Sequence, residues 1–207
     1  MTKRTFLQSI ILLLSVAFLL SLHSLTRAEK ADQEGPLGLT WGTTSDQVRA
    51  LGAELKDMPK SDYGASFVAT KLPRVLSDQE ATIISFGYDD RLWRLVAISK
   101  AFPDDPTGTN LKVRYQELLA ILAEKYGAPS SVHNLGDSIF QQSQYFLAGV
   151  KDGRTNWYTN FSTPSLSVQL NLSAEDSSTG RWRIIYEEKS LHKAFDVAKK
   201  AREKGAL

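Results

Sequence analysis

The sequence predicts an α+β protein of two similar halves, each a helix followed by an antiparallel sheet of three to four strands, plus a C-terminal helix. Three observations lead to this class. A long apolar stripe with helical spacing lies near the middle of the chain, segments with two-residue alternation lie on both sides of it, and single helical segments separate these runs. Antiparallel strands divided by single helices are typical of α+β folds rather than of parallel α/β sheets.

The N-terminus predicts a secretory signal peptide over residues 1–28. Two basic residues precede an uncharged apolar run over 10–22, and Ala28 offers a small residue for cleavage. A membrane-spanning helix needs about 20 apolar residues, and this run is shorter. We therefore expect export through the general secretory route, with the polar residues 29–36 forming a disordered lead-in.

Cleavage changes the charge of the chain. The full sequence has 25 basic and 23 acidic residues, and loss of Lys3, Arg4 and Arg27 leaves 22 against 23, a net charge of −1 instead of +2. Bulk charge then gives no support for nucleic-acid binding. The sequence contains no cysteine, which excludes disulfides, a thiol nucleophile, cysteine metal sites and a lipidated cysteine. A bacterial protein in the periplasm or outside the cell is the expected class.

Residues 37–104 predict the first half. Gly42 turns the chain into a short helix that Thr43, Thr44 or Ser45 can cap. The Asp89-Asp90 pair between two alternating segments predicts the turn of a hairpin. The expected strands lie at 64–72, 82–88 and 92–101.

The segment 109–126 predicts the central helix, which opens the second half over residues 105–207. Thr109 or Asn110 can cap its first turn, and Gly127 suits a residue with positive φ after its last turn. Leu119 and Ile121 widen the apolar arc, which favours packing on a sheet. The apolar stripe itself consists of Leu111, Tyr115, Leu118, Leu122 and Tyr126.

The rest of the second half predicts a sheet and a closing helix. Residues 130–144 are polar and predict a long connection with at most one short strand, and Asp152-Gly153 predicts a turn. A stripe of Leu191, Phe195, Ala198 and Ala201 predicts the last helix. The expected strands lie at 145–150, 157–161, 166–173 and 181–187.

Three short motifs carry a resemblance to known proteins. They are Gly38-Leu39-x-Trp41-Gly42-x-Thr44, Phe86-x-Tyr88-Asp89-Asp90-x-Leu92 and Lys125-Tyr126-Gly127-Ala128-Pro129. They resemble small exported bacterial proteins with tandem helix-plus-sheet repeats, similar to the beta-lactamase-inhibitor protein and to outer-membrane assembly lipoproteins of the SmpA/OmlA type. The resemblance implies this fold and the binding of other proteins across a sheet face without catalysis. The chain departs from it by lacking both the lipidated cysteine and the disulfides.

Four strand residues are candidates for recognition: Trp93, Tyr158, Arg181 and Arg183. Large aromatic residues and arginine are enriched in binding hot spots, and alternation can place some of these four on an outward sheet face. The alternative is that the aromatic side chains pack in the core and the arginines are solvated.

The sequence predicts no catalytic residue, no metal site and no cofactor. It contains no phosphate-binding glycine-rich loop and no nucleophile elbow. His133 and Asp137 could share a metal ion, but two ligands in one loop need further ligands to form a site. The pairs Asp89-Asp90 and Asp104-Asp105 lie in predicted turns, where Asp is favoured for local hydrogen bonds.

The sequence thus predicts an exported, non-enzymatic protein-binding protein, inhibitory or envelope-associated, whose partner is another exported or envelope protein. It predicts no nucleic-acid partner and no stable membrane insertion after signal cleavage. One alternative is a small-ligand-binding or hydrolytic periplasmic protein that uses the loop from His133 to Asp137. Another is a structural role near the membrane through the basic last helix, which carries Lys193, Lys199, Lys200, Arg202 and Lys204.

Overall fold

The computed structural model describes residues 35–59 and 61–206. The predicted signal peptide and most of the predicted lead-in lie outside the described residues. The chain from Pro36 onward forms one compact unit, and all that follows concerns this unit. None of its helices, within the described part of the chain, is long and apolar enough to cross a membrane.

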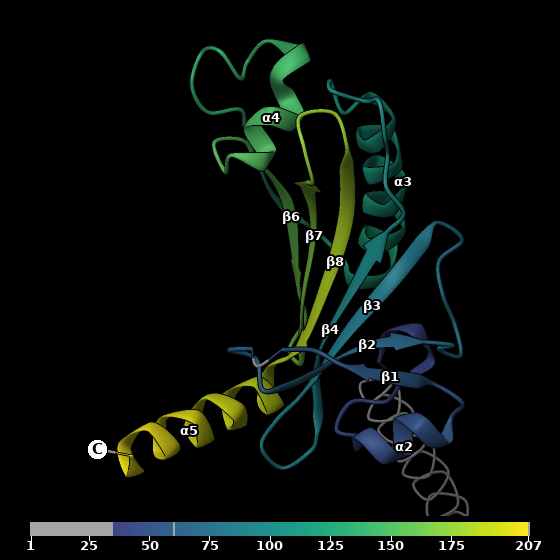
Figure 1. Cartoon of the computed structure of the whole chain (residues 1–207), viewed down its shortest axis with the longest axis vertical. Helices are drawn as coiled ribbons and strands as arrows, with labels where there is room; N and C mark the ends of the chain where they lie inside the picture. Colours follow the sequence, from purple (N-terminus) through teal and green to yellow (C-terminus); the bar gives the residue numbers. More distant parts are fainter. Residues whose placement is uncertain (1–34, 60, 207) are drawn as a thin grey trace, which may run out of the picture. The chain divides into compact units, whose positions relative to one another are not determined.

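One eight-stranded antiparallel sheet is the framework of the unit (Figure 1). Its strand order is β1-β2-β3-β4-β8-β7-β6-β5, so β1–β4 and β5–β8 are two runs of consecutive neighbours that meet where β4 pairs with β8. The predicted α+β class with an antiparallel sheet and a C-terminal helix is confirmed. The strands are β1 (Glu54–Asp57), β2 (Ala65–Thr70), β3 (Gln79–Phe86), β4 (Leu92–Ser99), β5 (Ser130–Asn134), β6 (Asn156–Ser162), β7 (Leu166–Ala174) and β8 (Gly180–Glu188).

The N-terminal part follows its local signals. After a 3-10 turn, η1 (Pro36–Gly38), the short helix α2 (Ser45–Ala50) begins at a capping box, in which Thr44 and Gln47 each bond the other's backbone N–H. This confirms Thr44 among the predicted caps. The predicted hairpin is also confirmed, since β3 pairs with β4 and Asp90 occupies the turn with a φ of 55°.

A β-bulge in this hairpin places two side chains on the same face. Ser85 pairs with Arg94 whereas Phe86 pairs with Leu92, so Trp93 is an extra residue in β4. Such a bulge directs consecutive side chains to one side of a sheet. Both Trp93 and Arg94 accordingly contact the ring of Tyr63, from the loop before β2.

The central helix, α3 (Thr109–Tyr126), has the predicted bounds and buries the predicted stripe apart from Tyr126, which is partly buried. The predicted cap is wrong: Gly108, with a φ of 63°, takes the N-cap position and has no side chain to cap the helix. The carboxylate of Asp105 instead accepts hydrogen bonds from the backbone N–H groups of Thr109 and Leu111, at 2.7 and 3.1 Å. Ile121 is 55% exposed, so the buried arc is narrower than predicted.

Two segments differ from their predictions. The predicted strand at 145–150 is helical and forms a 3-10 turn, η2 (Ser143–Tyr145), and α4 (Phe146–Lys151), because a short apolar run does not distinguish a buried helix from a strand. Two adjacent side chains, Phe146 and Leu147, are buried there. The edge strand β1 was not predicted, because it is polar and only Leu55 is partly buried.

The last helix, α5 (Lys189–Gly205), extends away from the sheet toward the C-terminus (Figure 1). Of its predicted apolar stripe, only Phe195 is buried. Basic residues along α5 contact the rest of the unit: Lys189 donates to the Ser162 hydroxyl at 2.8 Å, Lys199 lies 3.6 Å from Asp62, and the Arg202 guanidinium lies 4.1 Å from the ring centre of Tyr88.

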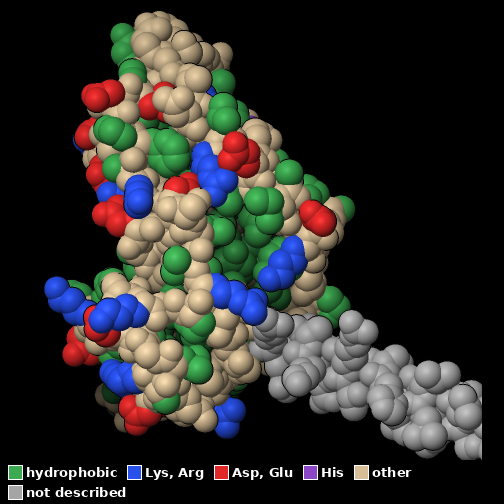
Figure 2. Space-filling view, turned by 90° about the vertical axis from the view of Figure 1, so that its right-hand side faces the viewer, with side chains coloured by type: hydrophobic (Ala, Val, Ile, Leu, Met, Phe, Trp, Pro, Cys, Tyr) green, Lys and Arg blue, Asp and Glu red, His purple; other side chains and the backbone are tan. Residues whose placement is uncertain are grey.

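The two faces of the sheet differ in what covers them. Helix α3 packs on one face, which we call the helix-covered face, and its Tyr115 hydroxyl lies 2.6 Å from the Thr159 hydroxyl of β6. Trp182, Ile184 and Tyr186 of β8 are buried there, as predicted from their alternation. Figure 2 looks onto this side and shows charged side chains of both signs around one hydrophobic hollow.

Candidate binding face

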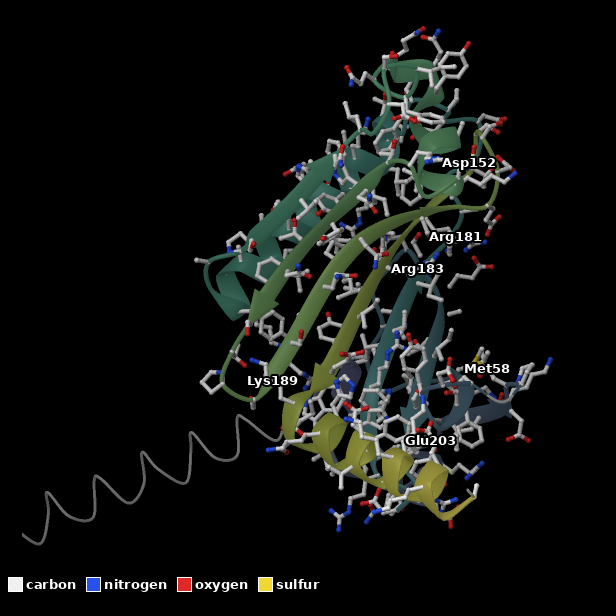
Figure 3. All side chains as sticks on the ribbon, turned by 90° about the vertical axis from the view of Figure 1, so that its left-hand side faces the viewer. Met58, Asp152, Arg181, Arg183, Lys189 and Glu203 are labelled. Carbon is white, nitrogen blue, oxygen red and sulfur yellow. The ribbon has the colours of Figure 1, made fainter. Side chains whose placement is uncertain are left out.

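The opposite face of the sheet, which we call the open face, presents two rows of side chains. Figure 3 looks onto this face: α4 lies beyond one end, α5 crosses the other end, and no helix of the described chain crosses its middle. The pairing register defines each row across neighbouring strands. The first row is Val68, Ile83, Val96, Ile185, Gln169 and Asn160, and the second is Ala81, Ile98, Arg183, Asn171, Tyr158 and Val132.

The first row is aliphatic at one end and polar at the other. Its residues in β2, β3, β4 and β8 are aliphatic, and among them Val68, Ile83 and Ile185 are partly exposed. Its residues in β7 and β6 carry side-chain amides. The Gln169 amide donates to Asn160 Oδ1 at 2.9 Å, and the Asn171 amide donates to Gln169 Oε1 at 3.0 Å. The open face therefore combines an aliphatic surface with a hydrogen-bonded amide ladder.

A small cavity lies beside the first row, toward α5. Arg94 crosses it, with Nε 2.9 Å from Glu187 Oε1 and the guanidinium carbon 3.9 Å from the ring centre of Tyr63. The volume of the cavity, about 190 Å³, is below the roughly 300–1,000 Å³ of typical small-molecule sites and is suited to a single side chain. The lining residues are Tyr63, Arg94, Asn160, Ser167, Gln169, Ile185 and Glu187.

Of the four predicted binding residues, Trp93 is the one that the structure buries. It is 1% exposed and stacks on His192 and Phe195 of α5, with ring centres 4.5 and 5.0 Å away. Phe195 in turn stacks on Tyr88 at 5.3 Å. Among the described residues, the indole Nε1 of Trp93 has no hydrogen-bond partner. Trp93 thus anchors α5 on the sheet, and its predicted contact with a partner protein stays a prediction.

Arg181 lies at the margin of the open face and is engaged by the protein itself. Its guanidinium pairs with Glu80 from β3 and Glu175 from the β7–β8 turn, and it also bonds the carbonyl of Ser99. The side chain is 19% exposed. These contacts join β8 to β3, across β4, and leave Arg181 little freedom to contact another molecule.

Tyr158 and Arg183 lie together in the second row, separated only by Asn171. Tyr158 is partly exposed and Arg183 is exposed. The Nε of Arg183 donates to the Ser173 hydroxyl at 2.9 Å. Although Arg183 is exposed, the surrounding sheet desolvates its guanidinium enough to lower its pKa. These two of the predicted residues are therefore the ones that the fold presents on the open face.

The predicted alternative site, His133 and Asp137, lies elsewhere. His133 is in β5 on the helix-covered face, where its ring stacks on Trp157 at 4.1 Å and meets the edge of Tyr115 at 6.0 Å. Partial burial of the ring lowers the pKa of His133. No group of three or more His, Cys, Asp or Glu residues that could hold a metal ion occurs within 35–59 and 61–206.

Sequence reasoning found only part of the open face. The alternation of β7 already placed Gln169 and Asn171 on its polar side, so the amide ladder had a sequence signal. Ile185 had none, because it is an apolar residue on the polar side of β8. Tyr63 also had none, because it reaches the cavity from a loop.

Comparisons of the chain with protein-family models, with curated proteins and with solved structures give no match. The side chains of the two rows on the open face form a mixed apolar and amide surface. Among these twelve described residues, no arrangement resembles a paired acid and base or a nucleophile with its base.

Proposed function

We propose that this protein is exported, has no enzymatic activity, and binds another exported or envelope protein on the open face of its sheet. The observation that carries the proposal is the combination of partly exposed aliphatic side chains with an amide ladder on a face whose middle is free of described helices. Large exposed apolar patches with polar surroundings mark interaction sites. The protein's role is inhibitory or envelope-associated.

The size of this face favours a protein partner over a small ligand. The first row crosses six strands, and at about 4.8 Å between strands it spans roughly 24 Å. A standard interface of about 800 Å² per partner is roughly 28 Å across, so the length of the first row is close to the width of such an interface. The cavity beside Arg94, at about 190 Å³, then accepts one partner side chain rather than a metabolite.

The proposal extends to the two halves of the fold. Each run of four strands follows a helix, α2 before β1–β4 and α3 before β5–β8, and the runs are joined through β4 and β8. We infer that the halves are structural repeats, as in the beta-lactamase-inhibitor protein and the SmpA/OmlA-type lipoproteins that the sequence motifs resemble. The order of the elements supports this inference.

The test is affinity capture from bacterial envelope extract with residues 29–207 as bait. Wild-type bait is expected to retain one partner in stoichiometric amount. Ile83→Asp is expected to lose it, because a carboxylate between Val68 and Val96 on the aliphatic surface must be desolvated on binding. Ile121→Asp is the matched control: it makes the same change at an exposed position of α3, on the other side of the sheet.

Thermal unfolding of Ile83→Asp and Ile121→Asp shows first that both are folded, and Tyr158→Ala replaces Ile83→Asp if that variant is not. Loss of the partner with Ile121→Asp and its retention with the open-face variant would move the binding site to α3. Absence of any stoichiometric partner would contradict the proposed function.

A further inference from the structure

We propose that Arg183 is a subsite for a carboxylate, so that the partner protein presents an Asp or Glu side chain at the centre of the open face. This inference rests on the proposed function and names the chemistry of its partner. It follows from the charge pairing of the arginines, from the donors that Arg183 leaves available, and from its neighbours in the second row.

The other arginines that extend from β4, α3 and β8 have carboxylate partners within the protein. Arg94 pairs with Glu187 at 2.9 Å, Arg114 pairs with Asp78 at 2.8 Å, and Arg181 pairs with Glu80. No carboxylate of the described chain pairs with Arg183. It is also the only charged residue of the twelve named in the two rows, and Lys56 of β1, which pairs with Val68, continues the first row at the edge of the sheet. The middle of the two rows therefore presents one positive charge that has no carboxylate partner among the described residues.

The hydrogen bonds of Arg183 leave its outer donors available. Its Nε bonds Ser173 Oγ at 2.9 Å, which holds the guanidinium in one orientation. Among the described residues, no acceptor bonds its two terminal nitrogens. A guanidinium offers its donors in a planar fork, and a carboxylate accepts two of them in parallel. Ser173 thus orients the fork, and the partner supplies the acceptors.

The neighbours of Arg183 favour a protein carboxylate. On one side it faces Ile98 of β4 and on the other Asn171 of β7. An Asp or Glu side chain fits this position, because its carboxylate can bond the guanidinium while its methylene groups lie against the aliphatic side chain of Ile98. Phosphate groups are bound by clusters of cations or by helix N-termini, and neither feature is present in the two rows. The partial desolvation of the guanidinium also strengthens a charge-assisted bond to the partner.

A peptide titration tests the carboxylate chemistry directly. The probe is capped hexaglutamate, with capped hexaglutamine as the neutral control, and the readout is the NMR signal of the arginine Nε–H groups and of the side-chain amides. We expect saturable shifts at Arg183 and Asn171 with hexaglutamate only. Arg183→Gln should abolish the shift at Asn171, whereas Lys200→Gln, which removes one exposed positive charge from α5, should preserve it.

The captured partner provides the second measurement. Arg183→Gln is expected to weaken its binding about tenfold or more, as for the loss of a charge-assisted hydrogen bond. Arg183→Lys keeps the charge without the fork and should recover part of the affinity. Shifts that concentrate on α5, or an Asn171 shift that survives Arg183→Gln, would overturn the subsite.

The outcomes separate the two proposals. A partner that is lost with Ile83→Asp but keeps its wild-type affinity for Arg183→Gln overturns the carboxylate subsite and leaves the binding face in place. A partner that is retained by Ile83→Asp, Tyr158→Ala and Arg183→Gln alike overturns the proposed function, and with it the inference that depends on it.

Discussion

At the scale of single residues, three aspartates each connect separate elements of this fold. Asp105 bonds the first turn of α3, and Asp90 accepts from the backbone and hydroxyl of Ser45 at 3.1 Å each. Asp78 joins three distant parts of the chain, because it accepts from Arg114 of α3 and from the indole Nε1 of Trp182 in β8, both at 2.8 Å. Each acid stands in or beside a loop, where its side chain reaches the next element.

Asp78 should make stability depend on pH. Burial alone would raise its pKa, but the hydrogen bonds from Arg114 and Trp182 outweigh burial and lower it. A pKa that is lower in the folded state contributes stability above the unfolded value, about 4, and this contribution is lost as pH falls through the folded value. Wild type should therefore exceed Asp78→Asn in unfolding free energy at pH 7, with a difference that shrinks below pH 4.

Urea unfolding of both proteins between pH 2 and pH 7 measures this difference. Asp137→Asn serves as the control, since this residue is exposed and its carboxylate makes no hydrogen bond or ion pair with the described residues. A difference between wild type and Asp78→Asn that stays constant across this range would show that ionisation of Asp78 does not stabilise the fold.

At the scale of elements, α3 and α5 are attached to the sheet in different ways. Helix α3 buries four apolar side chains of its stripe, whereas α5 buries only Phe195. The attachment of α5 is a stack of rings in the order His192, Trp93, Phe195 and Tyr88, with Arg202 over the last ring. Stacked pairs contribute about 0.5–1.5 kcal/mol beyond their buried area.

Phe195→Ala should release α5 from the sheet. The substitution removes the ring between Trp93 and Tyr88, and a buried Phe→Ala change costs about 3–5 kcal/mol where the structure does not collapse. Hydrogen exchange over residues 189–205 is expected to accelerate while β7 and β8 keep their protection. Val197→Ala is the control, because Val197 is 62% exposed. Equal acceleration in α5 and the sheet would show that α5 unfolds only together with the whole unit.

At the scale of the whole molecule, the two runs of strands are joined along β4 and β8. Their ladder extends from Arg94–Glu187 to Ile98–Arg183, and the first of these pairs is also an ion pair at 2.9 Å. On the helix-covered face, Asp78, directly before β3, accepts hydrogen bonds from Arg114 of α3 and from Trp182 of β8. Backbone pairing, ion pairs and side-chain hydrogen bonds thus join the two parts of the chain.

The predicted halves should fold only together. Separation would leave β4 and β8 as open edges in the middle of an apolar core, and a fragment of this size buries proportionally less surface than the whole chain. Residues 37–104 and 105–207, expressed separately, should show poor amide dispersion and no sharp thermal transition, while the intact chain shows one. Two independent transitions that match those of the intact protein would establish two autonomous repeats.

The sequence by itself determined the elements whose signal is local. The stripe of α3, the hairpin of β3 and β4, and the alternation of β7 were predictable, because a residue's spacing along a helix or strand decides which face it occupies. The amides of the open face were visible in the same way. Segments with weak or short patterns, β1 and α4, were not.

Only the tertiary structure decided which face is open and which charges are free. Arg181 and Arg183 are two residues apart and look alike in the sequence, yet one is paired with Glu80 and Glu175 and the other has no carboxylate among the described residues. The difference arises because Glu80 lies 101 residues earlier and meets Arg181 only when β3, β4 and β8 align. Local periodicity indicates which face of a strand a residue occupies, whereas charge pairing depends on contacts between distant parts of the chain. For this reason the candidate site could be recognised only from the tertiary structure.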